Sequence, residues 1–195
     1  MTSFRTHRLR VHDGSRTPRQ RFAALRTCLT EFAPYGFRAT YHHLCRSAGI
    51  PVEPERDPQA LVRAVRELHA ARELWLAEYA GWRADRAAQK AAGVRIPDPP
   101  EPPRRLWCPD PEFHPVEPLP AVMPRILRAR PGAWARCPVC EADLGTTRYR
   151  DGHHVHRLCA GCGVSLGHRA ATPGPDRAAL AARAERWKLV WQRRG

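Results

Sequence analysis

The sequence predicts a mainly α-helical protein that carries a small β module near its C-terminus. Three features lead to this fold class. Apolar residues recur every three or four positions across residues 17–95, which is typical of helices that share a core. Residues 97–131 then hold 12 of the 20 prolines in the chain. Beyond them, two Cys-x-x-Cys pairs flank two short segments that read as strands.

Residues 1–16 are expected to form a basic N-terminal arm. Their arginines are opposed by one acid, Asp13, and the segment lacks the apolar run of a signal peptide. The helical domain is expected over residues 17–95. Its first helix should begin at Thr17, because Thr17 and Gln20 have the spacing of a capping box and a proline stands between them at the first helical position. The apolar face of this helix comprises Phe22, Leu25, Leu29 and Phe32.

Two more helices are expected in this domain. The shorter one passes through Leu44 and ends at Gly49. The longer one covers residues 57–93, with Asp57 as its N-cap and Gly93 just past its end. Its apolar stripe comprises Leu61, Val65, Leu68, Trp75, Tyr79 and Trp82. We expect this stripe to be bundle core; alternatively, helix 57–93 pairs with a protein partner or with a second copy of the chain as a homodimer.

Residues 96–131 are expected to form a Pro-rich linker. Proline fixes φ and lacks an amide hydrogen, so the segment should be an extended, semi-rigid spacer and not a helix or a central strand. Its first part, residues 97–120, carries five acids against Arg104 and Arg105. A mildly acidic spacer therefore separates two basic regions.

The most specific motif lies in the last region, residues 132–195. Cys137 and Cys140 form one Cys-x-x-Cys pair, Cys159 and Cys162 form another, and 18 residues separate the pairs. Two thiolates at this spacing can bind one ion, because the tight turn between them points both sulfurs the same way. The four cysteines are therefore candidate ligands of a single metal ion.

Between the pairs, residues 146–150 and 153–158 read as two strands, and Asp151-Gly152 is a strong hairpin signal. This order of elements resembles that of zinc ribbons over residues 136–169. The resemblance implies one structural Zn2+, which in small peptide sites supplies about 10–16 kcal/mol and replaces a missing core. Three alternatives stay open: iron in a rubredoxin-like site, redox chemistry at one pair, or a histidine in place of one cysteine, from His153, His154, His156 and His168.

A final helix is expected after Pro175, so that residues 132–195 would form a zinc ribbon followed by a C-terminal helix. Its apolar stripe comprises Leu180, Ala184, Trp187 and Trp191. The remaining cysteines receive simpler interpretations. Cys28 and Cys45 lie on apolar helix faces and should be core packing, and Cys108 with His114 is treated as incidental.

The formal net charge is +14 and the sequence pI is about 10.6, so a polyanion is the expected partner. We expect a non-catalytic nucleic-acid-binding protein, with DNA favoured over RNA; the alternative is a basic surface without a ligand. Arginines beside an aromatic side chain suit phosphate contact and base stacking. The candidate contact residues are Arg8, Arg10, Arg16, Arg128, Arg130, Arg136, Arg148, Tyr149, Arg150, Arg157, Arg183 and Arg186.

Two other function classes remain open. Residues 158–167, preceded by the first cysteine pair, are similar to the second half of zinc-stapled HNH nucleases of the recombination endonuclease VII kind. That resemblance implies a catalytic Asp-His motif that binds a divalent metal, and this chain lacks it; Asp151 and His154 are the only candidates. The chain could instead be a zinc-dependent adaptor between proteins. A helix-turn-helix around Leu44 is a further option, weakened by the long connection after Ile50.

No run of about 18 apolar residues exists, so no membrane span is expected. Paired cysteines of this kind suit a reducing compartment, and a cytoplasmic location is the corresponding expectation.

Overall fold

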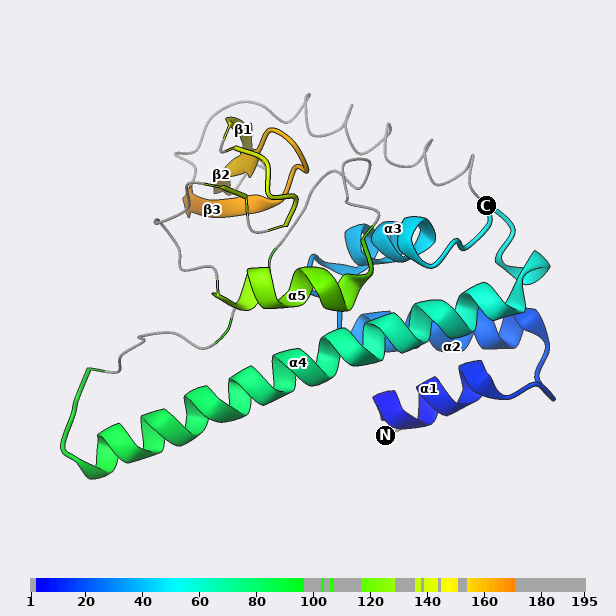
Figure 1. The fold of residues 1–195 in the computed structure, drawn as a ribbon, viewed down its shortest axis with the longest axis horizontal. Helices are drawn as coiled ribbons and strands as arrows, with labels where there is room; N and C mark the ends of the chain where they lie inside the picture. The colour runs from blue at the N-terminus through cyan, green and yellow to red at the C-terminus, as the bar shows by residue number, and fades with distance from the viewer. Residues whose placement is uncertain are drawn as a thin grey trace.

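The structure is a computed structural model that describes residues 3–96, 103, 106, 117–128, 136–137, 139–143, 145–150 and 154–170. Over these residues the fold is mainly helical, with one small three-stranded antiparallel sheet beside the cysteine pairs (Figure 1). The predicted fold class is therefore confirmed. The predicted C-terminal helix after Pro175 lies outside the described residues.

Helix α1, Phe4–His12, occupies the segment predicted to be a basic arm. Phe4 and Val11 are buried against the other helices, and the guanidinium carbon of Arg72 lies 4.8 Å from the centre of the Phe4 ring. The Nε of Arg21 donates a hydrogen bond of 2.7 Å to the main-chain oxygen of Val11. The arm interpretation is wrong for this segment, because two buried apolar side chains seven positions apart attach it to the helical domain.

Helices α2, Pro18–Glu31, and α4, Pro58–Ala91, begin where their caps predict. The Thr17 hydroxyl accepts from the Gln20 amide at 3.3 Å, and the Gln20 side chain accepts from the Thr17 amide at 3.1 Å. The Asp57 carboxylate accepts from two amides of the first turn of α4, at 2.9 and 3.0 Å. Helix α3, Phe37–Ser47, and the short 3-10 turn η1, Pro54–Arg56, complete the connection between them.

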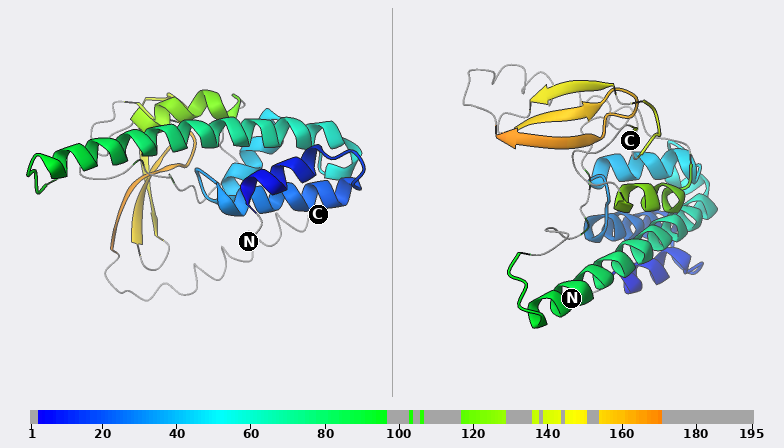
Figure 2. Two further views of the ribbon diagram at one scale, coloured as in Figure 1. Left: turned by 90° about the horizontal axis from the view of Figure 1, so that it is seen from below. Right: turned by 60° about the vertical axis from the view of Figure 1, so that its left-hand side comes forward.

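Helix α4 has two dissimilar halves. Its buried residues run from Ala60 to Ala71, and the rest of the helix extends beyond the other helices (Figures 1 and 2). On the extending half, the rings of Trp75, Tyr79 and Trp82 stack in sequence, with centroids 5.2 and 5.9 Å apart. The first half of the predicted stripe is thus bundle core, whereas its aromatic half is only partly buried.

Helix α5, Leu119–Arg128, lies inside the predicted linker and corrects that prediction. Its buried residues, Leu119, Val122, Met123 and Ile126, have the spacing of one apolar helix face. Pro120 falls in the first turn, where no amide donor is needed, so only Pro124 costs the helix an internal hydrogen bond. Burial of that face outweighs the single missing bond.

The sheet consists of β1 Thr146–Arg150, β2 His154–Cys159 and β3 Ser165–Ala170 in the order β1-β2-β3. The predicted hairpin is confirmed, although its Asp151-Gly152 turn lies outside the described residues. Figure 1 shows α5 between the sheet module and α4. The apolar core is continuous across this junction, because α5 and the cysteine turns both contribute buried residues to it.

Candidate metal centre

The two cysteine pairs meet in space. The sulfurs of Cys137, Cys140, Cys159 and Cys162 all lie within 4.8 Å of one another. Cys137 Sγ is 3.5 Å from Cys162 Sγ, and Cys140 Sγ is 3.7 Å from Cys159 Sγ. No other group of three or more His, Cys, Asp or Glu side chains in the described part of the chain has such spacing. Four sulfurs at these distances can hold one metal ion.

Two similar turns present the sulfurs. In the first turn the Glu141 amide bonds to the Cys137 carbonyl at 2.9 Å, and the Val139 amide points at Cys137 Sγ from 3.4 Å. In the second, the Gly163 amide bonds to the Cys159 carbonyl at 2.9 Å, and the Gly161 amide lies 3.3 Å from Cys159 Sγ. Amide hydrogens directed at sulfur favour the thiolate form that a metal requires.

The two glycines of the second turn have different roles. Gly163 has φ of 69°, a left-handed conformation that glycine adopts without steric cost. A Cβ added at Gly161 would instead lie 3.2 Å from Cys140 Sγ and 3.3 Å from the Ala142 Cβ. Gly161 is therefore required by the close approach of the two turns, and not by its backbone dihedral angles.

The close approach of the sulfurs and their burial shift the pKa values of Cys137, Cys140 and Cys162. The Cys162 thiol donates to Cys137, and this bond lowers the pKa of Cys137 to about 5. The same bond raises the pKa of Cys162, and burial raises the pKa of Cys140 to about 11. Cys137, Cys159 and Cys162 are almost fully buried, so their thiolates need a cation for neutralisation. A bound metal cation would supply that charge and favour the thiolate form of its ligands.

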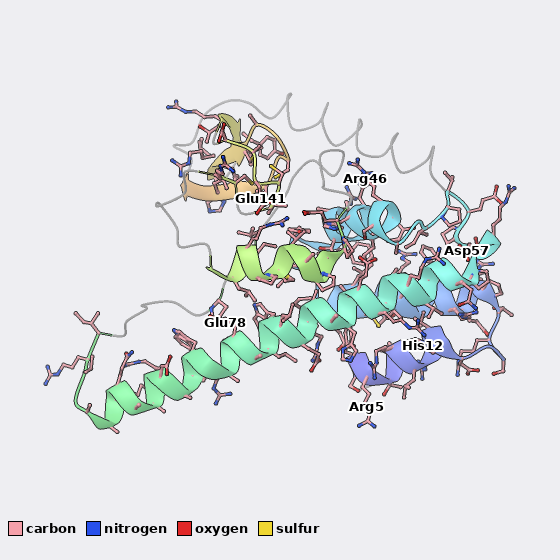
Figure 3. All side chains as sticks on the ribbon, viewed as in Figure 1. Arg5, His12, Arg46, Asp57, Glu78 and Glu141 are labelled. Carbon is pink, nitrogen blue, oxygen red and sulfur yellow. The ribbon has the colours of Figure 1, made fainter. Side chains whose placement is uncertain are left out.

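Arg125 links this centre to the helices, a role that was not predicted from the sequence. Its guanidinium donates to the Val139 carbonyl inside the first cysteine turn at 3.0 Å. The same group forms a two-pronged ion pair with Glu117 and lies 3.6 Å from the Glu141 carboxylate. Figure 3 shows Glu141 at the junction of the sheet module and α5. The Arg125 side chain therefore holds the first cysteine turn in place.

The candidate nucleic-acid contacts on the sheet lie on two faces. Arg148 of β1 and Arg157 of β2 are exposed and directly opposite each other in the register. Neither has an ion-pair partner among the described residues. Two residues further along the same face, Arg150 of β1 pairs with Val155 of β2. Val155 in turn pairs with Arg169 of β3. We refer to Arg148, Arg157 and the positions of Arg150 and Arg169 as the arginine face.

Tyr149 does not lie among these arginines. Side chains alternate along a strand, so Tyr149 belongs to the opposite face, where its ring centroid is 6.1 Å from that of His156. Phosphate contact by Arg148 and base stacking by Tyr149, which the sequence pattern combined, would therefore take place on opposite faces of the sheet. Arg136 forms an ion pair within the module, because its guanidinium lies 3.5 Å from the Asp143 carboxylate.

The N-terminal candidates form a second group. Arg8 and Arg10 are on α1, and Arg16 pairs with Asp13 at 3.1 Å. Helix α1 lies on the far side of α4 from the sheet, with Arg5 pointing outward from it (Figures 1 and 3). Arg128 is the last residue of α5. The remaining candidates Arg130, Arg183 and Arg186, together with Asp151, Cys108 and His114, lie outside the described residues.

Comparisons with family models, with curated protein sequences and with solved structures find no match to this chain. None of the helices in the described part of the chain combines the length and apolar character that crossing a bilayer requires.

Proposed function

We propose that the four cysteines bind one structural Zn2+ and that their module is a zinc ribbon. The supporting observation is the spacing of the sulfurs. A tetrahedral ion with metal–sulfur bonds of about 2.3 Å has sulfur–sulfur separations of about 3.8 Å. Two of the sulfur pairs, Cys137–Cys162 and Cys140–Cys159, are separated by 3.5 and 3.7 Å. Four thiolates fill the coordination shell, so the ion has a structural role and no open position for a substrate.

Metal analysis of the purified chain tests this first part. We expect one equivalent of zinc per chain and no iron, and we expect Cys140→Ser to lose most of it. Cys45→Ala is the matched control, since Cys45 belongs to α3 and not to the cluster. Iron as the resident metal, or zinc content unchanged in Cys140→Ser, would contradict the proposal.

We further propose that the protein binds nucleic acid, without catalysis, through the arginine face. Like charges directly opposite each other weaken a sheet, so Arg148 and Arg157 cost stability unless an anion lies near them. A phosphodiester backbone provides regularly spaced anions, and the net charge of +14 favours its approach. The proposal rests on this cross-strand pair of exposed arginines, for which the described residues provide no ion-pair partner.

The test is a salt titration of binding to short DNA and RNA of mixed sequence. Affinity should fall steeply as salt rises, because binding releases counterions. The double substitution Arg148→Ala/Arg157→Ala should reduce the steepness of the log–log salt dependence by about two, roughly one for each lost phosphate contact. Arg83→Ala/Lys90→Ala removes the same charge from exposed positions of α4 and should change the slope little.

Three outcomes would overturn this second part. They are absence of binding at low salt, affinity that is independent of salt, and equal effects of the two double substitutions. A stoichiometric protein complex that survives nuclease treatment and high salt would instead indicate the adaptor function.

A further inference from the structure

A row of basic side chains follows the junction of α1 and α4, on the side of α4 that faces away from the sheet (Figure 1). Near the start of α1, the guanidinium carbon of Arg72 and the His69 ring lie 4.8 and 6.1 Å from the centre of the Phe4 ring. Near its end, Arg21 donates to a main-chain oxygen of α1 at 2.7 Å and to one at the start of α4 at 3.2 Å. Helix α1 therefore runs antiparallel to the first half of α4. We call the row between these contacts the α1–α4 seam; it comprises Arg8 and His12 of α1 with Arg66, His69 and Arg72 of α4.

The seam brings like charges together. Burial lowers the pKa of His12, at the end of α1 (Figure 3), and the positive charges of Arg66 and Arg8 lower it further. Burial and Arg8 also lower the pKa of His69, although the Glu73 carboxylate 3.4 Å away opposes this effect. Arg8 therefore lies between two basic side chains, and Arg66 acts on α1 across the junction. Such repulsion costs stability unless an anion lies near.

The acids closest in sequence to these cations are engaged elsewhere. Asp13, which follows α1, pairs with Arg16 at 3.1 Å. Glu67 directs its carboxylate to the opposite side of α4, where it accepts from groups that belong to α3 and α5. Among the described residues, neither Arg8 nor Arg66 has an ion-pair partner. The middle of the seam therefore carries positive charge that no carboxylate of the described chain neutralises.

The length of the seam suits a phosphodiester backbone better than a small anion. Arg66, His69 and Arg72 are spaced three residues apart and span about 9 Å along α4. One strand of a duplex presents a phosphate about every 3.4 Å along its axis, so the row extends over two to three of them. A site for one small anion instead needs polar groups that converge on a single point. The cations of the seam are distributed along two helices and do not converge.

We propose that the α1–α4 seam is a second nucleic-acid site, in which Arg8 and Arg66 contact phosphates. Helix α1 and the sheet lie on opposite sides of α4 (Figures 1 and 3), so one protein molecule bridges two nucleic-acid segments. The bridging rests on the proposed function of the arginine face. Phosphate binding at the seam does not depend on it.

An energy-transfer assay tests the bridging. Two short duplexes, one labelled with a donor and one with an acceptor, are added in excess to the full chain at low salt. The parent protein should give energy transfer, because both labels are held on one molecule. Arg8→Gln/Arg66→Gln should still bind one duplex but lose the transfer; glutamine keeps part of the aliphatic stem that arginine buries. Arg83→Gln/Lys90→Gln removes the same charge from exposed positions on the other half of α4 and should bridge like the parent.

A salt titration tests the seam by itself. In Arg148→Ala/Arg157→Ala, the seam should carry the remaining affinity for DNA. Adding Arg8→Gln and Arg66→Gln to that variant should reduce the log–log salt slope by about two more, roughly one for each lost phosphate contact. Inorganic phosphate at constant ionic strength should not displace the duplex. Displacement by millimolar phosphate would overturn the inference, because it would indicate a site for a small anion.

The two proposals can fail separately. Parent-like bridging by Arg8→Gln/Arg66→Gln would overturn this inference and leave the arginine face intact, because the second contact would then lie elsewhere or on a second copy of the chain. A parent-like salt slope in Arg148→Ala/Arg157→Ala, together with loss of binding in Arg8→Gln/Arg66→Gln, would overturn the arginine face and the bridging. That second result would support phosphate binding at the seam. Thermal unfolding of each variant serves as the folding control.

Discussion

Arg125 of α5 donates a hydrogen bond of 3.0 Å to the main-chain oxygen of Val139, which lies between the first two cysteines of the candidate metal centre. The same guanidinium pairs with Glu117, whose own main-chain oxygen is 2.7 Å from His43 Nε2 of α3. A chain of polar contacts therefore runs from the cysteine turn, through α5, into the helical domain. The metal centre and the helices form one connected core, and not two modules joined by a spacer.

Arg125→Ala should destabilise this junction. The side chain is 19% exposed, and its loss leaves the Val139 carbonyl and the Glu117 carboxylate without their donor. The expected loss is about 1–3 kcal/mol in the free energy of unfolding, measured by urea denaturation with the metal bound. Arg125→Lys keeps the charge but not the two-pronged geometry, and should recover only part of the loss. A fully stable Arg125→Ala variant would show that the contact does not hold the turn.

Glu67→Ala should weaken the docking of α5 on α4. One carboxylate oxygen of Glu67 accepts from the Leu119 amide at 3.1 Å and from the Ser47 hydroxyl at 2.8 Å. Leu119 begins α5 and is fully buried, so its amide would lose its partner. We expect a loss of about 1–3 kcal/mol in unfolding free energy. Glu78→Ala, on the extending half of α4 (Figure 3), is the control and should change stability by less than about 0.5 kcal/mol.

The sequence predicted those features that depend on local chemistry. The caps at Thr17 and Asp57 act within one helical turn, so the starts of α2 and α4 follow from neighbouring residues alone. The cysteine spacing likewise fixes which sulfurs can meet. Alternation along β1 also suffices to place Tyr149 on the face opposite Arg148, an inference the sequence allowed but that was not drawn.

The errors arise where composition conceals a helical pattern. In α1, arginines outnumber the buried pair Phe4 and Val11, and in α5 the prolines hide an apolar face. The contacts of Arg125 could not be predicted, because they join residues 8 and 14 positions apart across a junction that exists only after folding. A basic side chain in a sequence does not reveal whether it contacts a phosphate or a neighbouring carbonyl.

Gly161→Ala should weaken metal binding without breaking a hydrogen bond. The added methyl group would lie 3.2 Å from Cys140 Sγ, so one of the two cysteine turns must move. Displacement of one ligand should lower metal affinity at least about tenfold, or about 1.4 kcal/mol, in competition with a chromophoric chelator. Gly14→Ala adds the same methyl group where nothing lies within 4 Å and should leave affinity unchanged. Equal affinities of the two variants would mean that the turns tolerate separation.

Acidification should destabilise the helical domain before carboxylates titrate. Burial lowers the pKa of His43 below its ordinary value of 6.5, and the pKa values of His12 and His69 are lowered in the same way. Below about pH 6.5 the unfolded chain therefore binds protons that the folded chain does not, so the unfolding free energy falls as pH decreases. Urea denaturation between pH 7.5 and 5.5 measures this slope.

His43→Gln tests the origin of that slope. Glutamine can still donate to the Glu117 carbonyl but does not titrate, so stability should depend less on pH than in the parent protein. The Tyr35 ring stacks on His43 with centroids 5.6 Å apart, so the substitution also changes packing. The two proteins are therefore compared by the pH dependence of their unfolding free energy and not by its absolute value. An unchanged slope would assign the effect to other groups.

Two glycine substitutions with the same chemical change should have opposite effects. Gly81 lies inside α4 with open space around its Cα, so Gly81→Ala adds no clash and reduces the freedom of the unfolded chain. It should stabilise the helix by about 0.5–1 kcal/mol, measured by amide hydrogen exchange along α4. Gly49 follows α3 with φ of 68°, where alanine is strained, so Gly49→Ala should destabilise the protein by about 1 kcal/mol. Faster amide hydrogen exchange around residue 81 in Gly81→Ala would contradict the prediction. It would mean that Gly81 marks a bend that α4 needs in solution.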